Sequence, residues 1–141
     1  MVGQVRENAA HAMFDVDTAS QSLGIELLEA ADGRAVTRMT VLPGMVNGHD
    51  IAHGGYVFLL ADTAFACACN SHGPVTVASA AEITFVAAVH RSDVLIATAA
   101  ERTTFGRSGI YDVTVHRSRA GDLDVVAEFR GHSRVVDQQR H

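Results

Sequence analysis

The run from Gly55 to Cys69, GYVFLLADTAFACAC, is apolar on almost every side, and Asp62 is its one charged residue. A helix that is apolar all round has to be buried on several sides, and the "SHGP" that follows would end it, so we expect a helix over residues 54–71. An ionised carboxylate in such a helix is costly unless it is paired, hydrogen-bonded or part of a site. Asp62 is therefore either a structural residue bonded to nearby backbone or a functional one.

Most of the remaining chain has the patterns of β-strands. Residues 4–14 suit a short helix, and "ADG" suits a tight turn between strands at 23–30 and 34–42. After the long helix we expect strands at 75–89, 93–103, 109–118 and 123–135. One apolar helix needs a sheet curved around it, and short turns between consecutive strands favour antiparallel pairing. The order predicts an α+β hotdog fold, an antiparallel β-sheet wrapped around a long central helix, in a single domain over residues 1–141.

Composition excludes several classes of protein. The net charge is −5, which argues against a broad basic face for nucleic acid. The run 55–69 is too short to span a membrane, and the N-terminal residues lack the apolar region of a signal peptide. The only cysteines, Cys67 and Cys69, would point to different sides of a helix, so we interpret both as core thiols. We expect a soluble protein of the reducing cytoplasm.

The entrance to the long helix suits a carbonyl-binding site. Gly54 and Gly55 stand where the loop "GMVNGHDIAHGG" meets the helix. Backbone N–H groups are unpaired at a helix N-terminus, the helix dipole is positive there, and glycine lets a ligand approach closely. Such groups build oxyanion holes, although the glycines also suit an ordinary tight turn. Asp62 lies about 12 Å further along the helix axis, so one site that used both would take Asp62 from a second subunit.

The same loop contains further candidates. Asn47 offers an amide for a water or a carbonyl, or it makes an ordinary loop turn. His53 either contacts a ligand or fixes the loop by a side-chain bond to backbone, and we favour the second role. His49 and His53 have a spacing that can bind zinc on a helix, but here it falls in a loop without a third ligand. We therefore expect no metal site.

The segment NGHDIAHGGYVFLLADTAFACACNSHG resembles the signature of hotdog-fold acyl-CoA thioesterases, and in particular their phenylacetate-pathway (PaaI-type) branch. NAAHAMFDVDTASQSLGIELLEA, GRSGIYDVTV and EFRGHSR resemble the first helix and strand and the later strands of that branch. The resemblance covers nearly the whole chain. It implies a homodimer with the active site between the subunits, dimers paired as a homotetramer, no metal and no cofactor, with coenzyme A as part of the substrate.

The resemblance also implies a role for each candidate residue. Asp62 matches the catalytic carboxylate, which acts as general base on water or as nucleophile on the thioester carbonyl. Gly54 matches the residue whose N–H polarises that carbonyl, with Gly55 beside it. Asn47 matches the residue that helps to place the water or the carbonyl, and His53 matches the histidine that shapes the pocket near the thioester.

A second segment, TTFGRSG (103–109), resembles one that contacts the coenzyme A arm. Gly106, Arg107 and Ser108 are the candidates, with Arg134 as a weaker one, and a turn with a solvated charge is the alternative for all of them. Many relatives have an Arg-Pro pair after the strand at 75–89, where this sequence reads ITFVAAVHRSD. This difference is expected to alter the loop that lines the acyl pocket or the dimer contact.

Thioester hydrolysis, on an aryl-acetyl or ring-hydroxylated aryl-acetyl group, is the leading hypothesis. Short- or medium-chain acyl groups stay open. A hotdog domain that binds acyl-CoA without cleaving it would need the cleft but not Asp62. A hotdog hydratase would need a catalytic histidine paired with an acid in a different motif, which this sequence lacks.

Overall fold

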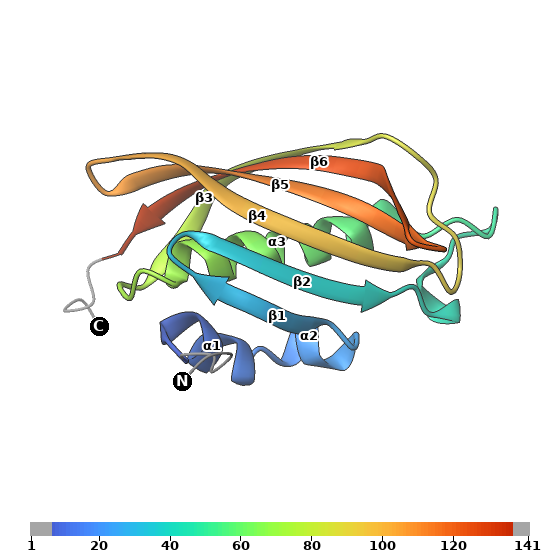
Figure 1. The fold of residues 1–141 in the computed structure, drawn as a ribbon, viewed down its shortest axis with the longest axis horizontal. Coiled ribbons are helices and arrows are strands. Elements are labelled where there is room, and N and C mark those ends of the chain that lie inside the picture. Colours follow the sequence, from blue (N-terminus) through green and yellow to red (C-terminus); the bar gives the residue numbers. More distant parts are fainter. Residues whose placement is uncertain (1–6, 137–141) are drawn as a thin grey trace.

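The computed structural model describes residues 7–136, and its main feature is one antiparallel sheet around a central helix (Figure 1). The strands pair in the order β1-β2-β4-β5-β6-β3. They are β1 (Glu26–Ala31), β2 (Arg34–Thr40), β3 (Thr76–Phe85), β4 (Val94–Phe105), β5 (Ser108–Arg119) and β6 (Asp122–Val135). The described residues contain no helix that is long and apolar enough to cross a membrane.

Helix α3 (Gly54–Asn70) packs along one face of this sheet. Leu60, Ala61, Ala64 and Phe65 are fully or almost fully buried, and the Phe65 ring meets the Tyr111 ring edge-on at a centroid distance of 5.6 Å. Tyr111, Val113 and Val115 alternate along β5 and are all buried in the core. The α+β hotdog arrangement predicted from the sequence is therefore confirmed.

One stripe of α3 is less deeply buried than the rest of the helix. Gly55 is exposed, and Phe58, Asp62 and Ala66 are half-buried, at spacings that put them on one side of the helix. Asp62 thus lies at the margin of the core rather than inside it. The helix ends at Asn70, whose side-chain amide donates to the Thr76 carbonyl at 2.9 Å and so joins α3 to β3.

The N-terminal region contains two short helices where the sequence predicts one. Helix α1 (Ala9–Asp15) is capped by Asn8, whose side chain accepts hydrogen bonds from two backbone N–H groups. Residues 4–6 of the predicted helix lie outside the described part of the chain. Helix α2 (Thr18–Ser22) was not predicted. Asp17 caps it, and Ser20 joins it to α3 through a contact of 2.9 Å between the hydroxyls of Ser20 and Thr63.

The loop between β2 and α3 starts with a short 3-10 helix, η1 (Pro43–Met45). The strand expected over residues 75–89 is shorter, because β3 ends at Phe85 and residues 86–89 form a connection toward β4. β3 lies at one edge of the sheet, and Val77 and Phe85 on it are exposed apolar side chains. The β4–β5 and β5–β6 turns are tight, with Gly106 and Gly121 in the left-handed region.

Candidate active site

Helix α3 begins with two glycines whose backbone donors are free. His53 is the residue before the helix, and its own N–H donates to the Met45 carbonyl at 2.9 Å. The His53 carbonyl accepts from Tyr56 N–H at 3.0 Å. Gly54 N–H and Gly55 N–H have no acceptor among the described residues, as expected for the first turn of a helix. The positive end of the helix dipole therefore presents two donors to any carbonyl placed there.

The loop before the helix is fixed by Asn47. Its side-chain oxygen accepts hydrogen bonds from His49 N–H at 2.9 Å and Ile51 N–H at 3.2 Å. Asn47 therefore makes the loop turn that was one of its two predicted roles. The NH2 group of its amide has no partner among residues 7–136. The His53 ring is exposed and makes no hydrogen bond within this part of the chain, so the loop is fixed by the backbone of His53 rather than by its ring.

Asp62 is a carboxylate in a partly apolar setting. Burial raises the pKa of its carboxyl above the ordinary value, and the negative charge of Asp17 raises that pKa further. Asp17 is held near it because its carboxylate accepts a hydrogen bond of 2.7 Å from Ser20, whose hydroxyl contacts Thr63. A carboxylate with a raised pKa is a better general base near neutral pH than an ordinary one.

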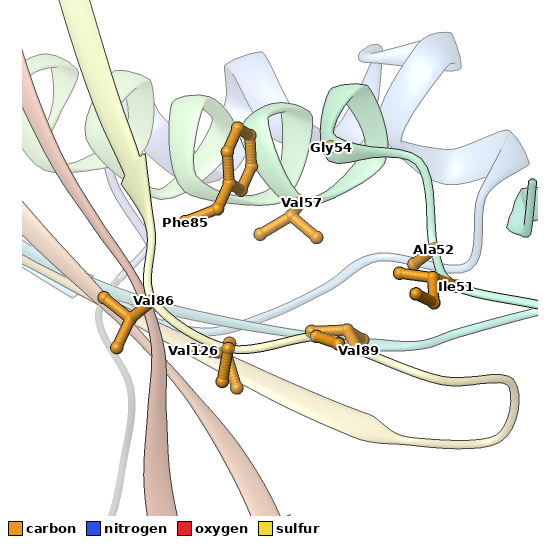
Figure 2. A pocket seen from close by; sticks show the side chains of 10 residues that line it. Ile51, Ala52, Gly54, Val57, Phe85, Val86, Val89 and Val126 are labelled. Carbon is orange, nitrogen blue, oxygen red and sulfur yellow. The ribbon is translucent and has the colours of Figure 1, made fainter. Parts of the chain in front are cut away.

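An apolar cavity of about 360 Å³ lies beside the N-terminus of α3 (Figure 2). The loop before α3 contributes Ile51 and Ala52, and the first turn of the helix contributes Gly54 and Val57. The opposite wall is the β3–β4 connection, residues 86–89, together with Val126 of β6, and Phe85 at the end of β3 also lines the cavity. Residues 85–89 of the segment ITFVAAVHRSD therefore line this cavity.

The candidates for the coenzyme A arm lie elsewhere. Gly106, Arg107 and Ser108 form the β4–β5 turn and line a small hollow of about 90 Å³ with residues at the C-terminal end of α3. Ser108 pairs with Arg134 across β5 and β6, so the structure brings all four predicted residues together. Gly54 lies at the other end of the helix, about 25 Å away along its axis.

One chain thus contains the elements of a site without assembling them. Gly54, Gly55, Asn47 and His53 gather at one end of α3, and Asp62 lies about two turns along the helix.

Burial raises the pKa of both Cys67 and Cys69 to about 12, which disfavours either thiol as a nucleophile. No group of three or more histidine, cysteine, aspartate or glutamate side chains in the described residues is arranged to hold a metal ion.

Two features of this region were not predicted from the sequence. The contact of Phe85 with the start of α3 was not predicted, although Phe85 is an aromatic residue at the end of an edge strand. Asp17 was not singled out either, although an aspartate before a Thr-Ala-Ser run is a helix N-cap signal.

The sequence model of the Thioesterase superfamily matches residues 49–122, which include α3 and its entrance. The chain belongs to this superfamily. It is therefore classed with the thioester hydrolases, and the family predicted from the sequence is confirmed.

Individual members of the superfamily are similar over most of the chain. The acyl-coenzyme A thioesterase PaaI of Escherichia coli (strain K12) is 44% identical over 90% of this chain and 89% of its own length. The solved structure of the E. coli PaaI protein superposes with a TM-score of 0.87 at 43% identity, covering 92% of this chain and 91% of that one. The structure of a point mutant of the phenylacetic acid degradation protein PaaI from Thermus thermophilus superposes with a TM-score of 0.78 at 32% identity, and the match covers 85% of this chain and 100% of that one.

Proposed function

We propose that this chain hydrolyses acyl-CoA thioesters, with an aryl-acetyl group, ring-hydroxylated or not, as the preferred acyl part. The observation that carries the proposal is the position of Gly54, whose free N–H lies at the wall of an apolar cavity. A thioester needs such a pair of features, a donor for its carbonyl oxygen and an apolar space for its acyl group. The 44% identity to the E. coli thioesterase supports the reaction and the acyl class.

The proposed site lies between two subunits. The edge strand β3 has unpaired backbone groups and exposed apolar side chains, which favours pairing with the same strand of a second copy. In this proposal, the half-buried stripe of α3 around Asp62 belongs to the surface that the second subunit covers. Asp62 of one subunit then faces Gly54 of the other, since no chain brings its own two residues together. Two such dimers pair as a tetramer in the proposed assembly.

The chemistry follows from these positions. The thioester carbonyl oxygen accepts a hydrogen bond from Gly54 N–H, with Gly55 N–H beside it. Asp62 takes a proton from water as the water attacks the carbonyl carbon, or it attacks that carbon itself. The oxyanion that forms is held at the helix N-terminus until the carbon–sulfur bond breaks and the coenzyme A thiolate leaves. If Asp62 attacks directly, water then hydrolyses the acyl-Asp62 anhydride. By either route the thiolate takes up the proton that water releases, and the products are free acid and coenzyme A.

The remaining candidates orient the substrate in this proposal. The free amide NH2 of Asn47 donates to the carbonyl or to the attacking water, and the exposed His53 ring borders the thioester. Gly106, Arg107, Ser108 and Arg134 hold the coenzyme A arm, because two guanidinium groups suit its phosphates.

The reaction and its acyl preference are tested by free-thiol release from phenylacetyl-, hydroxyphenylacetyl-, benzoyl-, acetyl- and hexanoyl-CoA. The proposal expects release from all that bind, fastest with the two phenylacetyl thioesters. Binding of acyl-CoA without release from any of the five would point instead to a domain that holds acyl-CoA without cleaving it.

The shared site is tested by mixing two inactive variants. Asp62→Asn removes the carboxylate, and Gly54→Pro removes the N–H donor at a first helical position whose backbone suits proline. The proline ring would press on Phe85, so circular dichroism first establishes that each variant is folded. In a mixed dimer, one site combines the intact Gly54 of one subunit with the intact Asp62 of the other. Refolding an equal mixture should restore about one quarter of wild-type activity, since half of randomly formed dimers are mixed and each has one intact site. A site within one chain would give no recovery, because every chain in the mixture is defective.

A further inference from the structure

The side chain of Phe85 lies directly over the first residue of α3. A Cβ atom added to Gly54 would be 2.6 Å from the tip of the Phe85 ring, closer than Cβ atoms approach other heavy atoms. The ring therefore occupies the space that a side chain at position 54 would need. The Phe85 ring lies beside Val57 of α3, on the α3 side of the cavity (Figure 2). The ring stands beside the proposed carbonyl donor and at the entrance to the apolar space.

The wall behind the ring is fixed by backbone hydrogen bonds. The N–H groups of Val86 and Ala87 both donate to the Val126 carbonyl, at 2.8 and 3.2 Å. Ala52 N–H donates to the Val89 carbonyl at 2.8 Å, which ties this wall to the loop before α3. The connection from β3 to β4 is thus hydrogen-bonded to its neighbours at both ends.

Arg117 attaches the middle of the same wall. Its side chain is 11% exposed, and one guanidinium nitrogen donates to the Ala88 carbonyl at 2.9 Å. Asp93 and Asp124 each lie 3.5 Å from the guanidinium and supply the opposing charge. A buried arginine held by two carboxylates is a stable anchor for a backbone carbonyl. The cavity is therefore lined by a hydrogen-bonded backbone, and the Phe85 ring, which is 53% exposed, is the largest side chain that lines it.

We infer that Phe85 is the residue that determines which acyl groups this protein accepts. The inference rests on the proposed thioester hydrolysis. The ring narrows the cavity next to Gly54, so the wild-type site takes compact apolar acyl groups. A smaller residue at position 85 admits longer ones. Phe85 acts on substrate choice and not on the chemistry, because it offers no donor, acceptor or proton.

The test compares kcat/KM across butanoyl-, hexanoyl-, octanoyl-, decanoyl- and phenylacetyl-CoA for wild type, Phe85→Ala, Phe85→Leu and Phe85→Trp. One methylene in an apolar pocket changes kcat/KM by roughly 10- to 200-fold, so Phe85→Ala should raise the decanoyl-to-butanoyl ratio by at least about tenfold. Phe85→Leu should give a smaller rise and Phe85→Trp a fall. Parallel loss for every thioester, with the ratios unchanged, would show that Phe85 is only structural.

Two controls keep the result interpretable. Leu123→Ala removes another exposed apolar side chain, 60% exposed and outside the cavity, and should leave every ratio unchanged. Since Phe85 lies on the proposed pairing strand, the mass of each variant in solution is measured, and Phe85→Leu, which keeps an apolar side chain, decides the outcome if Phe85→Ala dissociates.

The inference and the proposed function fail in different ways. Calorimetric titration of the same acyl-CoA series into Asp62→Asn and into Asp62→Asn with Phe85→Ala measures acyl preference without turnover. A shift of preference toward longer groups in the double variant supports the role of Phe85 even if wild type releases no thiol. An unchanged preference overturns that role even if wild type is an active hydrolase.

Discussion

Gly54→Ala adds only one methyl group, but it adds that group where the Phe85 ring already lies. The variant keeps the backbone N–H of residue 54, but its new methyl group would lie 2.6 Å from the Phe85 ring. The ring has to retreat to the 3.4 Å of an ordinary contact, a shift of about 0.8 Å. Alanine favours the helix by up to about 1 kcal/mol over glycine. Overpacking against a half-exposed ring lies at the low end of its range, about 1 kcal/mol, so the two effects should nearly cancel in the free energy of unfolding.

The effect on turnover should be much larger. A misplacement of about 1 Å in an active site costs up to about 100-fold, and the displaced ring lies between the carbonyl donor and the acyl cavity, so kcat/KM for phenylacetyl-CoA should fall roughly 10- to 100-fold. In a Phe85→Ala background the obstacle is gone, and Gly54→Ala should then change kcat/KM by less than about threefold.

The assay is thiol release by the four members of this double-mutant cycle, with unfolding in urea measured in parallel. Gly44→Ala is the matched control, because a Cβ atom at Gly44 meets nothing within 4 Å. The reasoning is refuted if Gly54→Ala lowers kcat/KM by the same factor with and without the Phe85 ring. Such a result would mean that residue 54 acts through its own backbone geometry.

Three further predictions concern charge and packing. Asp17→Asn should move the acidic limb of the pH profile of kcat/KM to lower pH, because loss of the Asp17 charge lowers the pKa of Asp62. Asp32→Asn, in an exposed turn, is the control. An acidic limb that does not move in Asp17→Asn would count against an effect of Asp17 on Asp62. Asp62→Asn should stabilise the fold at neutral pH. Folding raises the pKa of the Asp62 carboxyl, so the wild-type fold loses stability as pH rises from the unfolded-state pKa to the folded-state pKa, and asparagine avoids that loss. Urea unfolding should therefore show a higher free energy of unfolding for the variant at neutral pH, and the difference should shrink toward pH 3. Gly131→Ala should lower the free energy of unfolding by about 1–3 kcal/mol, because its Cβ atom would lie 2.7 Å from the buried ring of Phe65, and an unchanged urea midpoint would contradict the packing.

The long helix could be predicted closely because its signals are local. The apolar run and the two glycines before it define a helix over residues 54–71, and α3 spans Gly54–Asn70. Helix α2 could not be predicted in this way. It has five residues and no apolar stripe, and it is held by the Asp17 cap and the contact of Ser20 with Thr63 of α3. That contact joins residues far apart in sequence.

The candidate site was predictable in part for the same reason. Gly54, Gly55 and Asp62 stand out because each breaks the pattern of its own segment. The cavity has no such signal, since its walls come from the loop before α3, the β3–β4 connection and Val126, which meet only after folding. The role of Phe85 depends on its contact with Gly54, and two residues so far apart in sequence give no hint of that contact.

The central claim is that Asp62 carries out thioester cleavage, and the most direct test is the rate of thiol release by wild type and by Asp62→Asn. Both proteins are assayed on phenylacetyl-CoA at equal concentration, after circular dichroism has shown that both are folded. We predict that Asp62→Asn still binds the thioester but releases thiol about 100- to 10,000-fold more slowly, the range expected for the loss of a general base. Full turnover by folded Asp62→Asn would contradict the account.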